Sequence, residues 1–261
     1  MMVKDLEAGV LLACLLAGAF GCASAVSRPE DVARTWERAM VALPSDPSPS
    51  PKFFSSPGKA AAPAPLPTVL YMHVCSAIGG DEMQWARTLT RAGYAVVMPD
   101  SFARSYRRTD CDPANTRGGL FPEAFAMRDE EIRYAAAQLR TLPWVDARNL
   151  FLMGTSEGGA AAALWGGGGF NGQIIVAWWC RHGGDRLLDG IRAPFAIPML
   201  AINFERDPWF SPYYASSACA TRLRGYRDGS ELILRKTGHN AGGEPEAERA
   251  VLDFLRRHTR P

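Results

Sequence analysis

The sequence predicts an α/β fold in which a mostly parallel, doubly wound β-sheet carries helices on both faces. Short apolar runs alternate along the chain with longer segments of helical character, and the apolar runs are continuous. Strands of this kind are buried on both faces, as in sheets built from strand–helix–strand units. With 261 residues, the chain is long enough for one large core of this type.

The expected strands and helices follow one another from residue 68 onward. Buried strands are expected at 68–74, 94–99, 150–154, 174–179, 197–204 and 231–236. Helical patterns occur at 81–92, 122–142, 157–165, 213–225 and 244–259. Because functional loops gather at the carboxyl ends of parallel strands, the segments after these strands are where we expect a site.

The N-terminal part is expected to lie outside this core. Residues 1–25 have the pattern of a signal peptide, with an apolar run followed by a small-residue cleavage site, which predicts an exported protein. A lipid anchor on Cys22 is the alternative, and the apolar run is shorter than the roughly 20 residues that span a bilayer. Residues 26–67 are expected to form a short helix, at 29–43, and a Pro-rich arm, with the compact functional domain at 68–261.

Charge and cysteine content limit the function classes. With 29 Lys and Arg against 27 Asp and Glu, nothing favours a nucleic-acid partner, and the arginines at 104–108 are expected to form a solvated loop. Export to an oxidising compartment predicts two disulfides among the four cysteines that follow the leader, with three connectivities open. The spacing of Cys and His indicates no metal site, and no cofactor is expected. These four cysteines are Cys75, Cys111, Cys180 and Cys219.

The most informative motif is Gly-Thr-Ser-Glu-Gly at 154–158, which stands between an apolar strand and an alanine-rich helix. This is the G-x-S-x-G nucleophile elbow in the strand–turn–helix context that the motif requires. A tight turn lifts the hydroxyl of Ser156 above the sheet, and glycines flank it because side chains would collide with neighbouring elements. We expect the N–H of Glu157, at the helix N-terminus, to face a developing oxyanion.

A nucleophilic serine needs a base that takes its proton and an acid that orients the base. Proteins with this elbow carry these partners in the order Ser, acid, His, on loops after later strands. Asp207 follows the fifth expected strand and His239 follows the sixth. The sequence therefore predicts a triad of Ser156, His239 and Asp207, with Glu205 as the nearest substitute for the acid; His182 breaks the order.

Two further sets of residues are expected at this site. The second oxyanion donor should be the N–H of Val74 or Cys75, in the loop after the first expected strand, which His73 is expected to brace. Aromatic residues near strand ends predict an apolar acyl or aryl pocket, with packing beneath surface loops as the alternative. These are Trp178, Trp179, Trp209, Phe210, Tyr213 and Tyr214.

Several separate motifs follow one another along the chain: Tyr71-Met-His-Val-Cys-Ser, Val97-Met-Pro-Asp-Ser-Phe102, Arg128 with Asp129, Pro143-Trp-Val-Asp146, the elbow, Asp207 and His239. Together they resemble the dienelactone hydrolase family over about residues 68–257. The resemblance implies an α/β-hydrolase domain that hydrolyses an ester or lactone. It also implies that Cys75 pairs with Cys111, and Cys180 with Cys219.

Two departures from the family bear on the substrate. Archetypal members use a cysteine nucleophile, whereas this elbow carries Ser156. The family's oxyanion loop has His-Gly where this chain has His73-Val74, and a branched side chain restricts the backbone there. We therefore expect a general serine esterase for small esters or lactones rather than a dienelactone hydrolase in the strict sense. A serine peptidase of related fold and a non-catalytic envelope binding protein are the alternatives.

Overall fold

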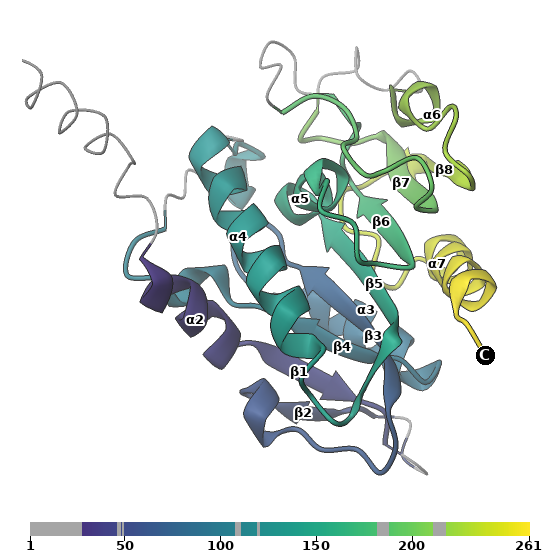
Figure 1. The fold of residues 1–261 in the computed structure, drawn as a ribbon. Helices are drawn as coiled ribbons and strands as arrows, with labels where there is room; N and C mark the ends of the chain where they lie inside the picture. The colour runs from purple at the N-terminus through teal and green to yellow at the C-terminus, as the bar shows by residue number, and fades with distance from the viewer. Residues whose placement is uncertain are drawn as a thin grey trace, which may run out of the picture.

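A computed structural model describes residues 28–45, 48, 50–107, 111–118, 121–181, 188–210 and 218–261. These residues form an eight-stranded sheet in the order β2-β1-β4-β3-β5-β6-β7-β8 (Figure 1). The strands from β3 onward run parallel to one another, whereas β1 is antiparallel to both β2 and β4. The strands are β1 (Met40–Leu43), β2 (Lys52–Phe54), β3 (Leu66–Met72), β4 (Ala95–Met98), β5 (Val145–Thr155), β6 (Gly172–Val176), β7 (Met199–Arg206) and β8 (Gly229–Thr237).

Helices cover both faces of this sheet (Figure 1). One face carries α2 (Pro29–Glu37), α4 (Pro122–Leu139) and α5 (Glu157–Leu164), and the other carries α3 (Gly80–Arg91) and α7 (Pro245–His258). α6 (Ala218–Arg222) packs beside β8, and 3-10 turns occur at Pro57–Lys59, Ser101–Ala103 and Pro113–Asn115.

The strands are buried on both faces, as their continuous apolar composition predicts. In β3, Leu70 and Met72 belong to one core cluster, while Val69 and Tyr71 belong to the other. This alternation follows from the two-residue period of a strand, which sends successive side chains to opposite faces. The sheet is therefore the shared wall between two apolar layers.

The N-terminal segment differs from the expected arm. The helix expected at 29–43 ends at Glu37, and Met40–Leu43 forms β1 between β2 and β4. β2 lies inside the Pro-rich stretch, at the sheet edge, where neighbouring prolines interrupt no central ladder. The core thus begins well before Thr68. A four-residue apolar run is too short for its period to separate strand from helix, which is why the sequence interpretation missed it.

The remaining strands agree with their expected ranges to within a few residues. Because β3, β5, β6, β7 and β8 are parallel, their carboxyl ends lie at one edge of the sheet. Of the helix expected at 213–225, the structure describes α6. The expected signal peptide, Cys22, His182, Tyr213 and Tyr214 lie outside the described residues. In the described part of the chain, no helix has the length and apolar character needed to cross a membrane.

Candidate active site

Ser156 stands at the tip of the turn between β5 and α5. Its backbone has φ 59° and ψ −118°, a strained conformation that residues other than glycine rarely adopt. Two backbone hydrogen bonds hold it there. The N–H of Ser156 donates to the carbonyl of Val176 at 2.8 Å, and its carbonyl accepts from the N–H of Ala160 at 2.9 Å.

The glycines around Ser156 are dictated by close backbone contacts. A Cβ on Gly154 would lie 2.2 Å from the carbonyl oxygen of Gly158. A Cβ on Gly158 would lie 2.0 Å from the carbonyl oxygen of Met72, and one on Gly159 would lie 2.4 Å from that of Val176. These separations are far inside van der Waals contact, so the elbow tolerates only glycine at these positions.

Asp207 and His239 come into direct contact at the ends of β7 and β8. The Nδ1 of His239 lies 2.9 and 2.8 Å from the two carboxylate oxygens of Asp207, whose side chain is only 1% exposed. The same carboxylate accepts the N–H of Trp209 at 3.0 Å. Because the carboxylate holds the proton on Nδ1, the imidazole presents Nε2 as an acceptor. This Nε2 is buried and has no hydrogen-bond partner among the described residues.

A small cavity of about 40 Å³ lies between the elbow and the aromatic residues. It is lined by Cys75, Gly118, Ser156, Glu157, Trp178, Trp209 and Phe210. The ring of Trp209 also stacks on His239, with centroids 5.2 Å apart and planes inclined by 28°. No hydrogen bond joins Ser156 to the unpartnered Nε2 of His239 in this structure. Trp179 is buried but does not line the cavity, which differs from the expected pocket.

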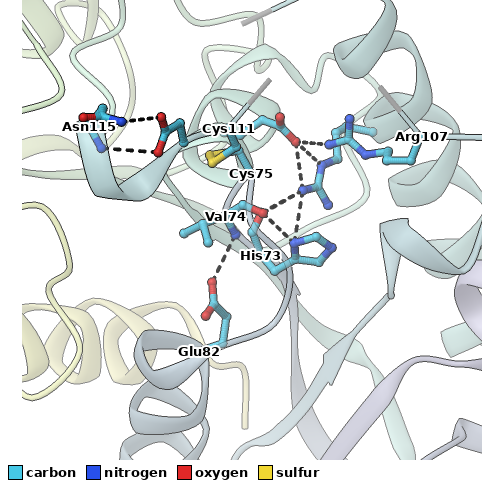
Figure 2. Close-up of a disulfide and its surroundings, with 10 residues drawn as sticks. His73, Val74, Cys75, Glu82, Arg107, Cys111 and Asn115 are labelled. Carbon is cyan, nitrogen blue, oxygen red and sulfur yellow. Dashed lines mark hydrogen bonds and ion pairs between the residues drawn. A yellow bond between two sulfur atoms is a disulfide. The ribbon is translucent and has the colours of Figure 1, made fainter. Parts of the chain in front are cut away.

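The loop after β3, which is expected to supply an oxyanion donor, is held by Glu82, which the sequence interpretation did not single out. Its carboxylate accepts the N–H of Val74 (Figure 2), at 3.0 Å. It also accepts the N–H of Gly79, at 2.8 Å. The N–H of Val74 is therefore engaged by Glu82, which removes one of the two expected donors. Among the described residues, the N–H of Cys75 makes no backbone hydrogen bond.

His73 braces this loop, as expected. Its Nε2 accepts the N–H of Ser101 at 3.1 Å, so the ring proton sits on Nδ1, which donates to the carbonyl of Val74 at 2.6 Å. The ring is completely buried. Burial and the nearby Arg128 hold the pKa of His73 well below its usual value, so this histidine stays neutral.

Beneath the elbow lies a buried ionic cluster, which corrects the expectation of a solvated loop at 104–108. Glu157 accepts from the Nε of Arg128 at 2.9 Å and also pairs with Arg107. Glu131 accepts from the Nε of Arg104 at 2.8 Å and from the hydroxyl of Ser101. Burial and Arg128 lower the pKa of Arg107, and Glu157 opposes this. These charged residues come from segments far apart in the chain, so no local sequence spacing predicts that they form ion pairs.

Two disulfides border the site, and their pairing is the one implied by the resemblance. Cys75 is bonded to Cys111, with Cα atoms 5.7 Å apart (Figure 2), and Cys180 is bonded to Cys219, with Cα atoms 5.1 Å apart. The first ties the oxyanion loop to the segment that ends at Gly118, which packs closely against the ring of Trp209. The second ties the segment after β6 to α6. Among the described residues, no group of His, Cys, Asp or Glu side chains is arranged to hold a metal.

Comparison with known proteins supports the fold through structure rather than sequence. No family model and no curated protein matches the chain. An esterase from the archaeon Pyrobaculum calidifontis superposes over 87% of this chain and 88% of its own, with TM-score 0.54 and 16% identity. The chain has the α/β-hydrolase fold.

Two further solved structures show how varied the neighbours are. A dienelactone hydrolase-like protein from Klebsiella pneumoniae matches 84% of this chain and 96% of its own, with TM-score 0.56 and 15% identity. Dipeptidyl peptidase 4 from Porphyromonas gingivalis matches 85% of this chain and 33% of its own, with TM-score 0.52 and 15% identity. At such identities the likeness concerns the α/β-hydrolase fold alone, so any activity has to be argued from the site.

Proposed function

We propose that this protein is a serine hydrolase that cleaves carboxylic esters or lactones through an acyl-enzyme. The observation that carries the proposal is the buried Asp207–His239 pair, whose Nε2 has no partner among the described residues. Trp209 both stacks on His239 and lines the cavity that contains Ser156, so the pair lies beside the elbow. A buried acceptor nitrogen of this kind is suited to take the proton of a nucleophile.

In this mechanism, the Oγ of Ser156 attacks the ester carbonyl carbon while Nε2 of His239 takes the hydroxyl proton. Asp207 keeps the imidazole in the required tautomer and stabilises its cation. His239 then protonates the leaving alkoxide. In the second stage, water attacks the acyl carbon while His239 takes its proton, and His239 returns that proton to the Oγ of Ser156 as the acid leaves. Because catalytic hydrogen bonds are often long before substrate binds, we expect the Ser156–His239 contact to form in the complex.

The oxyanion would be held by two backbone N–H groups. That of Glu157 lies at the N-terminus of α5, where the helix dipole favours negative charge. The second is the N–H of Cys75, because Glu82 already engages the N–H of Val74. The buried charges around Glu157 and the Cys75–Cys111 disulfide both support the backbone that carries these donors.

The cavity favours small, uncharged acyl or aryl groups. Aromatic rings form much of its wall, and Glu157, its one charged residue among those described, is paired with Arg107 and Arg128.

A serine peptidase remains the alternative, since a dipeptidyl peptidase shares the fold. A panel of short aryl esters and peptide amides with the same acyl group separates the two, and we expect faster turnover of the esters.

Export is part of the proposal and is supported by the two disulfides, which persist in oxidising compartments. We propose cleavage after Ala25, with lipid modification at Cys22 as the alternative. The intact mass and N-terminal sequence of the mature protein distinguish a start at Val26 from a diacylated Cys22.

Labelling with a fluorophosphonate probe tests the catalytic assignment. We expect the wild type to be labelled and Ser156→Ala to be unlabelled, with ester turnover reduced by about four orders of magnitude or more. Ser55→Ala, which changes an exposed serine, should label as the wild type does. Equal labelling of wild type and Ser156→Ala, or no labelling of either, would reject a Ser156 nucleophile.

A further inference from the structure

One buried carboxylate contacts both halves of the site although neither proposed catalytic step uses it. The Oδ1 of Asp81, in the first turn of α3, accepts the N–H of Gly242 at 2.6 Å. Its Oδ2 accepts the hydroxyl of Thr155 at 3.1 Å and lies 3.4 Å from the hydroxyl of Tyr71. Thr155 immediately precedes the nucleophile, and Gly242 lies three residues after His239.

We propose that Asp81 is a positioning residue that joins the strand end before Ser156 to the loop that carries His239. This inference rests on the proposed function, because it assigns Asp81 a role in the same reaction. It also rests on a close approach of backbones: a Cβ on Gly242 would lie 2.7 Å from the Oδ1 of Asp81 and 2.8 Å from its carbonyl oxygen. The loop therefore docks on the start of α3 with no room for a side chain between them.

The donors around Asp81 suit an ionised carboxylate. Gly242 donates a backbone N–H, and Thr155 and Tyr71 contribute hydroxyls whose oxygens lie 2.5 Å from each other. Burial and the neighbouring Asp81 raise the pKa of Tyr71 well above its usual value, so its hydroxyl remains a donor. The carboxylate accepts the N–H of Gly242 and the hydroxyl of Thr155, whose oxygen accepts in turn the hydroxyl of Tyr71.

Charged and titratable groups from every packed element act on Asp81. They are Glu82 on α3, Tyr71 on β3 and His239 on the loop after β8; the neighbour from β5 is the neutral Thr155. Burial raises the pKa of Asp81 to about 6, and Glu82 adds to this, whereas the Gly242 and Thr155 hydrogen bonds and a cationic His239 lower it. Because that attraction is mutual, ionised Asp81 favours the imidazolium that forms during catalysis.

This environment separates a positioning role from a purely structural one. A pKa raised from 3.8 to about 6 in the folded state means that folding favours protonated Asp81 over ionised Asp81. The stability that protonated Asp81 contributes is complete below pH 3.8 and is lost as the pH rises through about 6. The isostere in Asp81→Asn keeps an acceptor for Gly242 without the charge. It should therefore stabilise the protein at pH 8 while it slows catalysis. A structural role would instead lower both.

The first experiment compares wild type, Asp81→Asn and the control Asp146→Asn, which changes an aspartate at the opposite end of β5. For Asp81→Asn at pH 8, we expect kcat on an aryl acetate to fall about tenfold with KM within twofold. Its Tm should rise by about 2–4 °C, with the difference vanishing toward pH 4. On the acid side of the pH profile, the slope of log kcat against pH should fall by one, because one group fewer has to lose a proton. Wild-type kcat at every pH, or a joint loss of kcat and Tm with an unchanged pH profile, would overturn the proposal.

The second experiment is independent of turnover. Hydrogen exchange of the 238–243 backbone should be faster in Asp81→Ala than in wild type, and near wild type in Asp81→Asn, because only the alanine removes the acceptor. Unchanged exchange in Asp81→Ala would show that Asp81 does not hold the loop. If wild type neither hydrolyses esters nor reacts with the fluorophosphonate, the proposed function fails, and the exchange result still decides whether the contact exists.

Discussion

The nucleophile half of the proposed site, Ser156 with Glu157 and the proposed oxyanion loop, rests on buried ions and backbone contacts. The acid–base half, Asp207 with His239, is packed instead against aromatic rings. In the first half, the side chains of Glu157 and its arginine partners are at most 4% exposed. In the second, Trp209 and Phe210 are partly exposed.

The two halves are therefore kept in position by different interactions. Breaking a buried ion pair by removing one partner costs roughly 3–5 kcal/mol, whereas an aromatic pair contributes about 0.5–1.5 kcal/mol beyond its buried area. We therefore expect the nucleophile half to be coupled to the stability of the fold. The acid–base half should adjust more readily, which suits a His239 that has yet to reach the Ser156 hydroxyl in this structure.

The largest effect on stability is expected from Gly158→Ala, in the backbone of the nucleophile half. The new Cβ would lie 2.0 Å from the carbonyl oxygen of Met72, so β3 and the start of α5 must separate. We expect the free energy of unfolding to fall by about 3 kcal/mol or more and kcat/KM to fall by more than 100-fold. Chemical denaturation and ester turnover measure the two losses.

Gly80→Ala is the matched control, because nothing lies within 4 Å of a Cβ at that helical position. Its stability should stay the same or rise by up to about 1 kcal/mol. Near-wild-type turnover and stability in Gly158→Ala would contradict the packing of the elbow against β3.

A smaller effect, mainly on stability, is expected from Glu157→Gln. The amide keeps the shape of the side chain but leaves Arg107 and Arg128 without their shared carboxylate, so we expect the free energy of unfolding to fall by about 2–4 kcal/mol. Turnover of the folded variant should fall less than in Gly158→Ala. In the control Asp129→Asn, loss of an exposed pair with Arg133 should change stability by about 0.5 kcal/mol or less. Equal losses of stability in Glu157→Gln and Asp129→Asn would show that burial does not strengthen the ion pairs of Glu157.

What the sequence could predict depends on how local the physical cause is. The elbow is recognisable because its glycines are required by contacts within the turn and with adjacent strands, which are local to the motif. The parallel core follows equally directly from continuous apolar strands. Asp207 and His239 could be placed because the fold sets the order of its loops.

The parts that the sequence interpretation missed depend on distant partners. Asp81 and Gly242 are 161 positions apart, and Arg107 is 50 positions from Glu157, so no spacing rule joins them. The choice between Val74 and Cys75 as donor turns on where the carboxylate of Glu82 points, which is a matter of side-chain geometry. β1 was missed because four apolar residues carry too little periodicity.

The smallest effect on stability, and a clear effect on activity, is expected from Trp209→Ala in the acid–base half. The indole stacks on His239 and walls the cavity, so its loss should free the imidazole and lower kcat/KM for aryl esters about 3–10-fold, in line with the energy of one aromatic pair. Trp209→Phe should retain most of the activity. The control Phe195→Ala removes an exposed ring that contacts Tyr226 and should leave turnover unchanged. A Trp209→Ala variant that loses several kcal/mol of stability would show that this half, too, is built into the fold, and the contrast between the halves would disappear.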